Sequence, residues 1–128
     1  MFFRPRDPVA TQLVALGLPS AAADRLSSAG TLLHLRAGTT LCTEGERGTQ
    51  AFVMVEGEAS VHTANGVVTL GPGEVVGEIA ALDSTRHRNA DVVTATPATV
   101  LVFDLATFRS LATSDDLKSR LAPVRTAA

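Results

Sequence analysis

Residues 50–70, QAFVMVEGEASVHTANGVVTL, decide what kind of fold the chain adopts. Apolar and β-branched side chains form three short runs here, at 50–56, 58–63 and 67–70, and the last two are separated by Ala64-Asn65-Gly66. An Asn-Gly pair between alternating runs favours a hairpin, because both residue types tolerate the positive φ angles of tight turns. The stretch therefore predicts three consecutive strands, the last two joined as a hairpin.

The same pattern extends outward from this stretch to Thr31 and Phe103. Runs rich in Val, Thr and Leu alternate with turn residues at short intervals, which is typical of an all-β barrel or sandwich. The additional strands that the pattern predicts are 31–36, 40–43, 91–95 and 99–104.

Helices are predicted on both sides of the strands. Asp7-Pro8 supplies an N-cap and a first helical residue, Leu13 and Leu16 form an apolar stripe, and Gly17 ends the helix. The other predicted helices are 21–28, 105–111 and 114–121, the last of which Pro123 ends early. We expect one mainly β domain over 1–128: N-terminal helices (1–30), a jelly-roll-type β-roll of about eight strands (31–104) filled by Val, Leu and Phe52, and truncated C-terminal helices (105–122).

Composition excludes several classes of function. The 128 residues are 45% apolar, and 11 basic against 13 acidic side chains leave a net charge of −2, which argues against a nucleic-acid binder. Apolar runs are too short for a membrane span or a secretory signal, and a single cysteine, Cys42, cannot form an internal disulfide. We expect a cytoplasmic protein in which Cys42 is a core residue, whereas Phe2 and Phe3 belong either to an interface or to the core.

Residues 71–91, GPGEVVGEIAALDSTRHRNAD, interrupt the strand pattern, and loops of this length tend to be functional. A short helical turn entered through Gly77 leaves unpaired backbone N–H groups that can hold an anion, and Arg88 offers a guanidinium suited to phosphate oxygens. Glu78 would repel a phosphate, so it fits this site if it accepts hydrogen bonds from a neighbouring sugar hydroxyl. The alternatives are a surface ion pair for Arg88, with Asp83 or Asp91, and a helix-start carboxylate for Glu78.

The stretch resembles the phosphate-binding cassette of the cyclic nucleotide-binding domain family, which includes bacterial catabolite-activator-type regulators and regulatory subunits of cAMP-dependent kinase. The matching residues are Gly77-Glu78-Ile79-Ala80 and Arg88-Asn89-Ala90, followed by an apolar strand that begins at Val92. The similarity extends over roughly 32–121, and it includes Gly45-Glu46, the segment 52–57, the segment 70–74, Leu105 and Phe108.

The resemblance implies a role for each matching residue. Glu78 would accept a hydrogen bond from the ribose 2′-hydroxyl, Gly77 would let the ribose approach the backbone, and amides around Ile79 and Ala80 would hold the cyclic phosphate together with Arg88. Val61 and Val67, both expected to face inward, would form an apolar wall along the sugar and the base.

Two departures from the family pattern change these expectations. Asn89 replaces the usual hydroxyl residue beside the arginine, so its contact with base or phosphate can differ from the family's. The family usually adds a long C-terminal helix that covers the base, and the bacterial regulators add a helix-turn-helix domain. The last predicted helix of this chain ends at Pro123, so we expect neither the covering helix nor the helix-turn-helix domain. Without the covering helix we expect a modest affinity. We expect the output to pass through an unknown effector protein or through self-association as a homodimer.

The sequence therefore favours a module that binds a cyclic mononucleotide, cAMP ahead of cGMP, without catalysis and without a metal. One competing hypothesis is an interaction or scaffold module that keeps the fold and binds no nucleotide. A second is a cupin-like metal-dependent enzyme, but His34, His62 and His87 are far apart in sequence and form no His-x-His pair.

Overall fold

The computed structural model of the chain describes residues 7–46, 49–76 and 90–112. Two helices, α1 (Pro8–Ala15) and α2 (Ser20–Ala29), precede the strands, and α4 (Leu105–Ala112) follows them. The strands are β1 (Thr31–Leu35), β2 (Thr40–Cys42), β3 (Gln50–Glu56), β4 (Ala59–Thr63), β5 (Gly66–Leu70), β6 (Val75–Val76), β7 (Asp91–Thr94) and β8 (Ala98–Asp104). The predicted helix over 114–121 lies outside the described residues.

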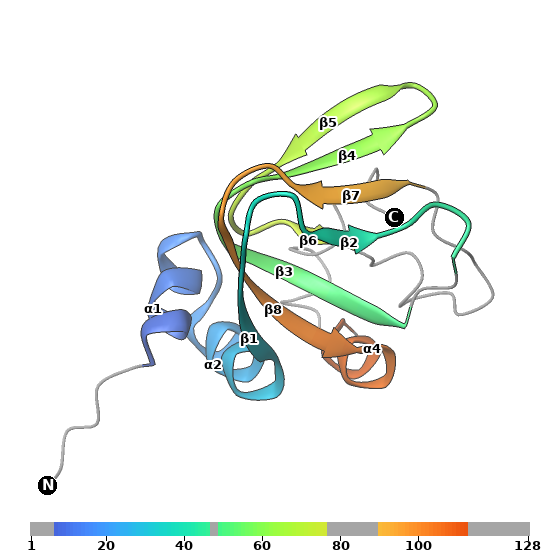
Figure 1. Cartoon of the computed structure of the whole chain (residues 1–128). Coiled ribbons are helices and arrows are strands. Elements are labelled where there is room, and N and C mark those ends of the chain that lie inside the picture. Colours follow the sequence, from blue (N-terminus) through green and yellow to red (C-terminus); the bar gives the residue numbers. More distant parts are fainter. Residues whose placement is uncertain (1–6, 47–48, 77–89, 113–128) are drawn as a thin grey trace, which may run out of the picture.

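The strands form two four-stranded antiparallel sheets, with the orders β1-β8-β3-β6 and β2-β7-β4-β5. Strands that follow each other in sequence often belong to different sheets, as β3 and β4 do, so the chain crosses between the sheets repeatedly. Figure 1 shows the helices beside β1, β8 and β3, while the β4–β5 hairpin projects away from them. The mainly β roll with flanking helices that the sequence predicted is confirmed.

The start of α1 is formed as its sequence predicted. The Asp7 side chain accepts a hydrogen bond from the backbone N–H of Val9 at 3.1 Å, and Pro8 is the first helical residue. The Asp7 carboxylate also accepts a hydrogen bond from the hydroxyl of Ser27 on α2. These two bonds lower the pKa of Asp7, the bond from Ser27 contributing most, so the ionised cap joins the two N-terminal helices.

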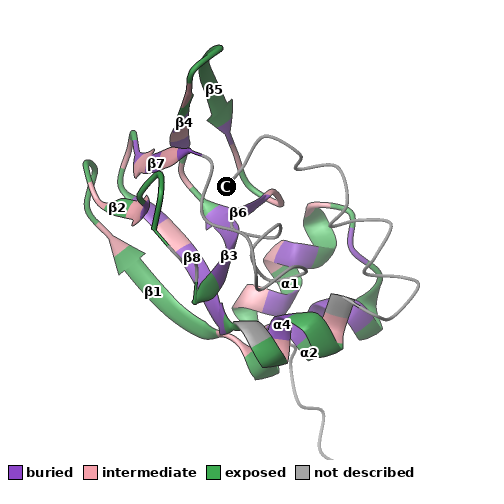
Figure 2. Cartoon of the chain, turned by 90° about the vertical axis from the view of Figure 1, so that its right-hand side faces the viewer, coloured by how far each residue is buried: buried purple, intermediate pink, exposed green. Residues whose placement is uncertain are grey.

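The core lies between the sheets and beneath the helices, and Figure 2 shows buried residues along the inner strands and on one side of each helix. Phe52 is buried among Val and Leu side chains, as the sequence predicted. Among the described residues, Phe103 on β8 and Phe108 on α4 are the two largest fully buried side chains, with ring centroids 6.0 Å apart. Their contact attaches α4 to the roll, because aromatic pairs at this spacing add to the stabilisation that burial provides.

A tight crossover at Gly57 joins β3 of one sheet to β4 of the other. Gly57 has φ +85°, and a Cβ atom there would lie 2.4 Å from the carbonyl oxygen of Pro97. The following residue, Glu58, donates its N–H to the hydroxyl of Thr96 at 2.9 Å and accepts from the N–H of Ala95. The crossover therefore packs directly on the turn between β7 and β8, where a side chain larger than hydrogen does not fit.

One strand was not predicted. Val75 and Val76 form β6, which pairs with Val53 and Phe52 of β3, so the prediction that 71–91 interrupts the strand pattern throughout is wrong at this point. Two residues are too few to show a periodicity, and the pairing with β3 is what makes this segment a strand.

Candidate functional site

The predicted phosphate segment begins at a turn held on β3. Gly73, at φ +88°, donates its N–H to the carbonyl of Met54 at 2.7 Å, and Met54 donates its own N–H to the carbonyl of Glu74 at 2.9 Å. Val75 and Val76 follow, and both are fully buried. The entrance to the segment is therefore part of the β1-β8-β3-β6 sheet.

The far end of the segment belongs to the other sheet. Ala90 is fully buried, and Asp91 begins β7, which pairs with β4 and β2. The carboxylate of Asp91 accepts a hydrogen bond from the backbone N–H of Glu44 at 2.7 Å, which connects this end to the turn after β2. Residues 77–89 therefore connect the two sheets, because β6 and β7 lie in different sheets.

Six of the predicted ligand-binding residues fall between these two ends: Gly77, Glu78, Ile79, Ala80, Arg88 and Asn89. They lie outside the described residues, as does His87, and their roles stay predictions. What the structure does describe is the position of both flanks, each buried, in two different sheets.

The two predicted wall residues on the β4–β5 hairpin lie on opposite faces of the sheet. Val61 on β4 is fully buried, so its predicted inward orientation is confirmed. Val67 on β5 is 62% exposed and pairs with the exposed His62, so the prediction that it faces inward is wrong. Residues directly opposite each other in a ladder share a face, and the partner of Val61 is Val68. Val68 is therefore the β5 residue on the inner face.

The cause of this error is the length of the hairpin turn. The sequence predicted a three-residue turn over 64–66, but Gly66 pairs with Thr63 and leaves a turn of Ala64 and Asn65. The hydroxyl of Thr63 donates to the carbonyl of Gly66 and accepts from the N–H of Asn65, both at 3.2 Å. A shift of one residue in the register moves every side chain of a strand to the other face, which is why Val68 replaces Val67. The prediction missed that the turn has two residues and ends one position earlier, at Asn65.

The inner face of this sheet is apolar around Val61. Val92 on β7 pairs with Val61 and is also fully buried, and Val68, on the other side of Val61, is 40% exposed. Val68 has exposed surface that can contact a bound molecule, whereas Val61 and Val92 beside it are buried. Val68 is therefore a better candidate than Val67 for the wall of a ligand site.

Other residues singled out in the sequence have structural positions. Cys42 is buried at the end of β2, as predicted for a core residue. His34 lies on β1 with Nδ1 3.1 Å from the hydroxyl oxygen of Thr99, while His62 lies on β4 in the other sheet. Within the described ranges, no group of three His, Cys, Asp or Glu side chains could hold a metal ion, and no helix is long and apolar enough to cross a membrane.

The helix that leaves the roll begins at an ionised cap. The carboxylate of Asp104, the last residue of β8, accepts a hydrogen bond from the backbone N–H of Thr107 at 2.7 Å. This bond is the main cause of the lowered pKa of Asp104, and a contact with the Thr107 side chain adds to it. The direction in which α4 leaves the sheet is therefore set by a charge-assisted cap and by the buried ring of Phe108.

Comparison with known proteins identifies the family. The family model described as the cyclic nucleotide-binding domain matches residues 32–115. This range includes β1 apart from its first residue, β2 to β8, the whole of the predicted phosphate segment and α4.

Curated relatives share this part of the chain. The Pycsar effector protein PaPycTIR of Pseudomonas aeruginosa is 36% identical over 92 residues, which are 70% of this chain and 30% of that protein. The cyclic nucleotide-gated potassium channel mll3241 of Mesorhizobium japonicum is 44% identical over 78 residues, which are 61% of this chain and 21% of the channel. The matched part is thus less than a third of either relative's length.

A solved structure supports the same fold. The structure titled "Sp-2Cl-cAMPS bound to PKAR CBD2" superposes with a TM-score of 0.69 at 23% sequence identity, covering 87% of this chain and 75% of the other. At this level of identity the superposition shows that the two chains share a fold.

Proposed function

The chain belongs to the cyclic nucleotide-binding domain family, and from this premise we propose that it binds a cyclic mononucleotide non-covalently inside the β-roll and acts as a regulatory module. The observation that carries the proposal is the family match across 32–115, which spans the predicted phosphate segment and both of its anchored ends.

The proposed binding chemistry uses one cation and several backbone donors. Arg88 and the amides around Ile79 and Ala80 hold the cyclic phosphate, because a guanidinium and N–H groups at a helix start both favour a negative charge. Glu78 accepts a hydrogen bond from the ribose 2′-hydroxyl, Gly77 gives the ribose access to the backbone, and Asn89 contacts the base or the phosphate. These roles follow from the resemblance of residues 77–80 and 88–90 to the family's cassette.

Val61 and Val68 form the apolar wall of the proposed site. Val61 is fully buried on the inner face, and Val68 is its exposed ladder partner on the same face. Contact with a nucleotide would remove the remaining apolar surface of Val68 from water, which is favourable.

We propose cAMP ahead of cGMP as the ligand, as the resemblance to catabolite-activator-type regulators and kinase regulatory subunits implies. The module is proposed to work in the cytoplasm and to perform no catalysis, because the proposed contacts, a guanidinium and backbone amides, hold a phosphate without attacking it. Since the matched part is less than a third of each relative's length, the output is proposed to act on an effector, either in the same polypeptide or in a partner.

Calorimetric titration with cAMP and cGMP tests the proposal. We expect a dissociation constant in the micromolar range, which corresponds to about −8 kcal/mol. Replacing Arg88 with Ala removes the proposed cationic partner of the phosphate. Loss of one partner of a buried charged pair typically costs roughly 2 kcal/mol or more, so the dissociation constant should rise at least about thirtyfold. Arg86→Ala is the matched control, because it removes the same charge from the same segment at a position outside the cassette motif.

The result also separates the alternatives. If neither nucleotide gives heat or a thermal shift at ligand concentrations near a millimolar, the chain is an interaction or scaffold module on the same fold. If both nucleotides bind and Arg88→Ala leaves the affinity unchanged, the phosphate is held elsewhere and the assignment of the cassette is wrong.

A further inference from the structure

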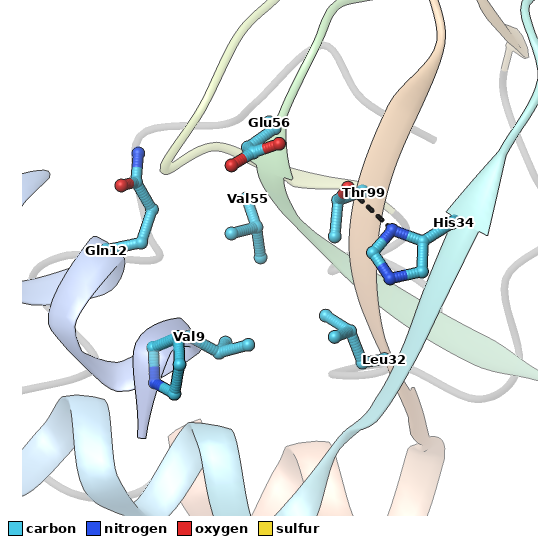
Figure 3. A pocket seen from close by; sticks show the side chains of 8 residues that line it. Val9, Gln12, Leu32, His34, Val55, Glu56 and Thr99 are labelled. Carbon is cyan, nitrogen blue, oxygen red and sulfur yellow. Dashed lines mark hydrogen bonds between the residues drawn. The ribbon is translucent and has the colours of Figure 1, made fainter. Parts of the chain in front are cut away.

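A groove of about 370 Å³ lies between α1 and the helix-bearing face of the β1-β8-β3-β6 sheet. Figure 3 shows Val9 on α1, Leu32 on β1 and Val55 on β3 pointing into it, with Gln12, Glu56 and His34 around its rim. His34 is held by its contact with Thr99, 3.1 Å between Nδ1 and the hydroxyl oxygen. The groove and Val61 are on different sheets, so the groove is separate from the proposed nucleotide site.

The shape of the groove favours a protein side chain over a small molecule. Val55 is buried, but Leu32 is 37% exposed, Glu56 is exposed, and Val9 and Gln12 are only half-buried. Small-molecule sites generally enclose most of the surface of their ligand, which these walls do not. A side chain that protrudes from a polypeptide needs less enclosure, because its own backbone covers the open side.

The charge of the groove defines its complement. None of the residues that line it is Lys or Arg, and Glu56 places an exposed carboxylate at the rim. An occupant that matches this surface presents an apolar side chain for Val9, Leu32 and Val55, with a cation close by for Glu56.

The first six residues of the chain, Met-Phe-Phe-Arg-Pro-Arg, have this chemistry. They lie outside the described residues, and the chain resumes at Asp7, directly before two groove residues, Pro8 and Val9. The four residues from Asp7 back to Phe3 can span at most about 14 Å when extended, so the phenylalanines are within reach of the groove.

We propose that the Phe2-Phe3 pair docks in this groove within the same molecule, and that Arg4 or Arg6 pairs with the carboxylate of Glu56. Docking removes aromatic surface from water, and this is favourable because a phenylalanine side chain buries a large apolar area. The segment would then cover the part of the sheet between α1 and β1, where Leu32 is exposed.

Nuclear magnetic resonance on the full chain tests this proposal. In the wild type we expect nuclear Overhauser effects between the ring protons of Phe2 or Phe3 and the methyl groups of Val9, Leu32 and Val55. Deleting residues 1–6 should shift the amide resonances of Val9, Gln12 and Leu32, and the synthetic hexapeptide Met-Phe-Phe-Arg-Pro-Arg, added to the shortened chain, should reverse those shifts.

A charge-matched pair of variants tests the contact with the carboxylate. In the shortened chain, Glu56→Gln should raise the dissociation constant of the hexapeptide about two- to fivefold, as expected for an exposed ion pair. Glu58→Gln, an exposed glutamate outside the groove, should leave it unchanged.

Three results would overturn the proposal: no Overhauser effect from either ring to the groove, amide shifts that map to another surface, or contacts that disappear on dilution and therefore come from a second copy. Because these readouts involve no nucleotide, failure of the groove proposal and failure of the nucleotide proposal are observed separately.

Discussion

The crossover at Gly57 makes the sharpest prediction about stability, because the chain contains a matched control. Gly57 and Gly38 have nearly the same backbone angle, φ +85° and +83°. A Cβ at Gly57 would lie 2.4 Å from the carbonyl oxygen of Pro97 and 2.8 Å from Cα of Ala98, whereas a Cβ at Gly38 would have no atom within 4 Å. Alanine at either site therefore has the same backbone strain. At Gly57 its Cβ also clashes with the backbone of Pro97 and Ala98, which would have to move.

The magnitudes follow from these two terms. A left-handed conformation costs a non-glycine residue about 1–2 kcal/mol, and forcing extra atoms into a packed site costs a further 1–3 kcal/mol or so. Gly57→Ala should thus lower the free energy of unfolding by roughly 2–5 kcal/mol and Gly38→Ala by roughly 1–2 kcal/mol. Since small domains are stable by only about 5–15 kcal/mol, the first variant should be visibly destabilised.

Urea denaturation followed by circular dichroism measures both values, provided that the wild type and the two variants unfold with the same m-value. The reasoning is refuted if the two glycine variants lose stability to the same extent, within about 0.5 kcal/mol. Equal losses would mean that the contact with the turn between β7 and β8 can relax at no cost, and that the crossover does not require a residue without a side chain.

Three further predictions concern the site, a helix cap and the core. Val68→Thr should weaken cyclic nucleotide binding in calorimetry by about 1 kcal/mol, roughly fivefold, because it places a hydroxyl against the ligand, while Val67→Thr should leave it unchanged. The Asp7 carboxyl has a lowered pKa in the folded protein, so its stabilising effect is present at neutral pH and is lost as the pH falls below the ordinary aspartate pKa of about 3.9. The stability difference between the wild type and Asp7→Ala in urea denaturation should accordingly shrink on acidification. Phe108→Ala should lower the free energy of unfolding by about 3–5 kcal/mol, again measured in urea, because it empties a fully buried site beside Phe103.

Each of these predictions has a contradicting result. Equal effects of the two valine variants would place the ligand away from the inner face of β5. A stability difference for Asp7→Ala that stays constant from neutral pH to pH values below the aspartate pKa would mean that the carboxylate contributes nothing through its charge. A loss below about 1 kcal/mol for Phe108→Ala would mean that α4 is attached to the roll by other contacts.

Local chemistry explains why some elements could be predicted from the sequence. The N-cap of α1 requires one short acceptor and a following proline, and Asp7-Pro8 supplies both within two positions. Strand β3 was predicted with its observed bounds, because a run of five apolar residues, 51–55, between turn signals is enough to identify a strand.

Other features depend on contacts between distant residues. Val75-Val76 is a strand because β3 lies beside it, and the face on which Val67 lies depends on which residue pairs with Thr63. The groove beside α1 is assembled from one helix and three strands, and the residues that line it run from Pro8 to Thr99. Such arrangements depend on register and packing, which neighbouring residues in the chain do not specify.

The order of polar and apolar residues by itself determined the class of fold, the positions of most strands and helices, and the cassette motif that identifies the family. Those properties depend on periodicity, caps and turn residues within a few positions of one another. The tertiary structure alone decided that Val68 and not Val67 faces the interior, that Gly57 must lack a side chain, and that both ends of the cassette are buried in different sheets. These depend on which strands become neighbours, and strand pairing brings together residues that are far apart in the sequence.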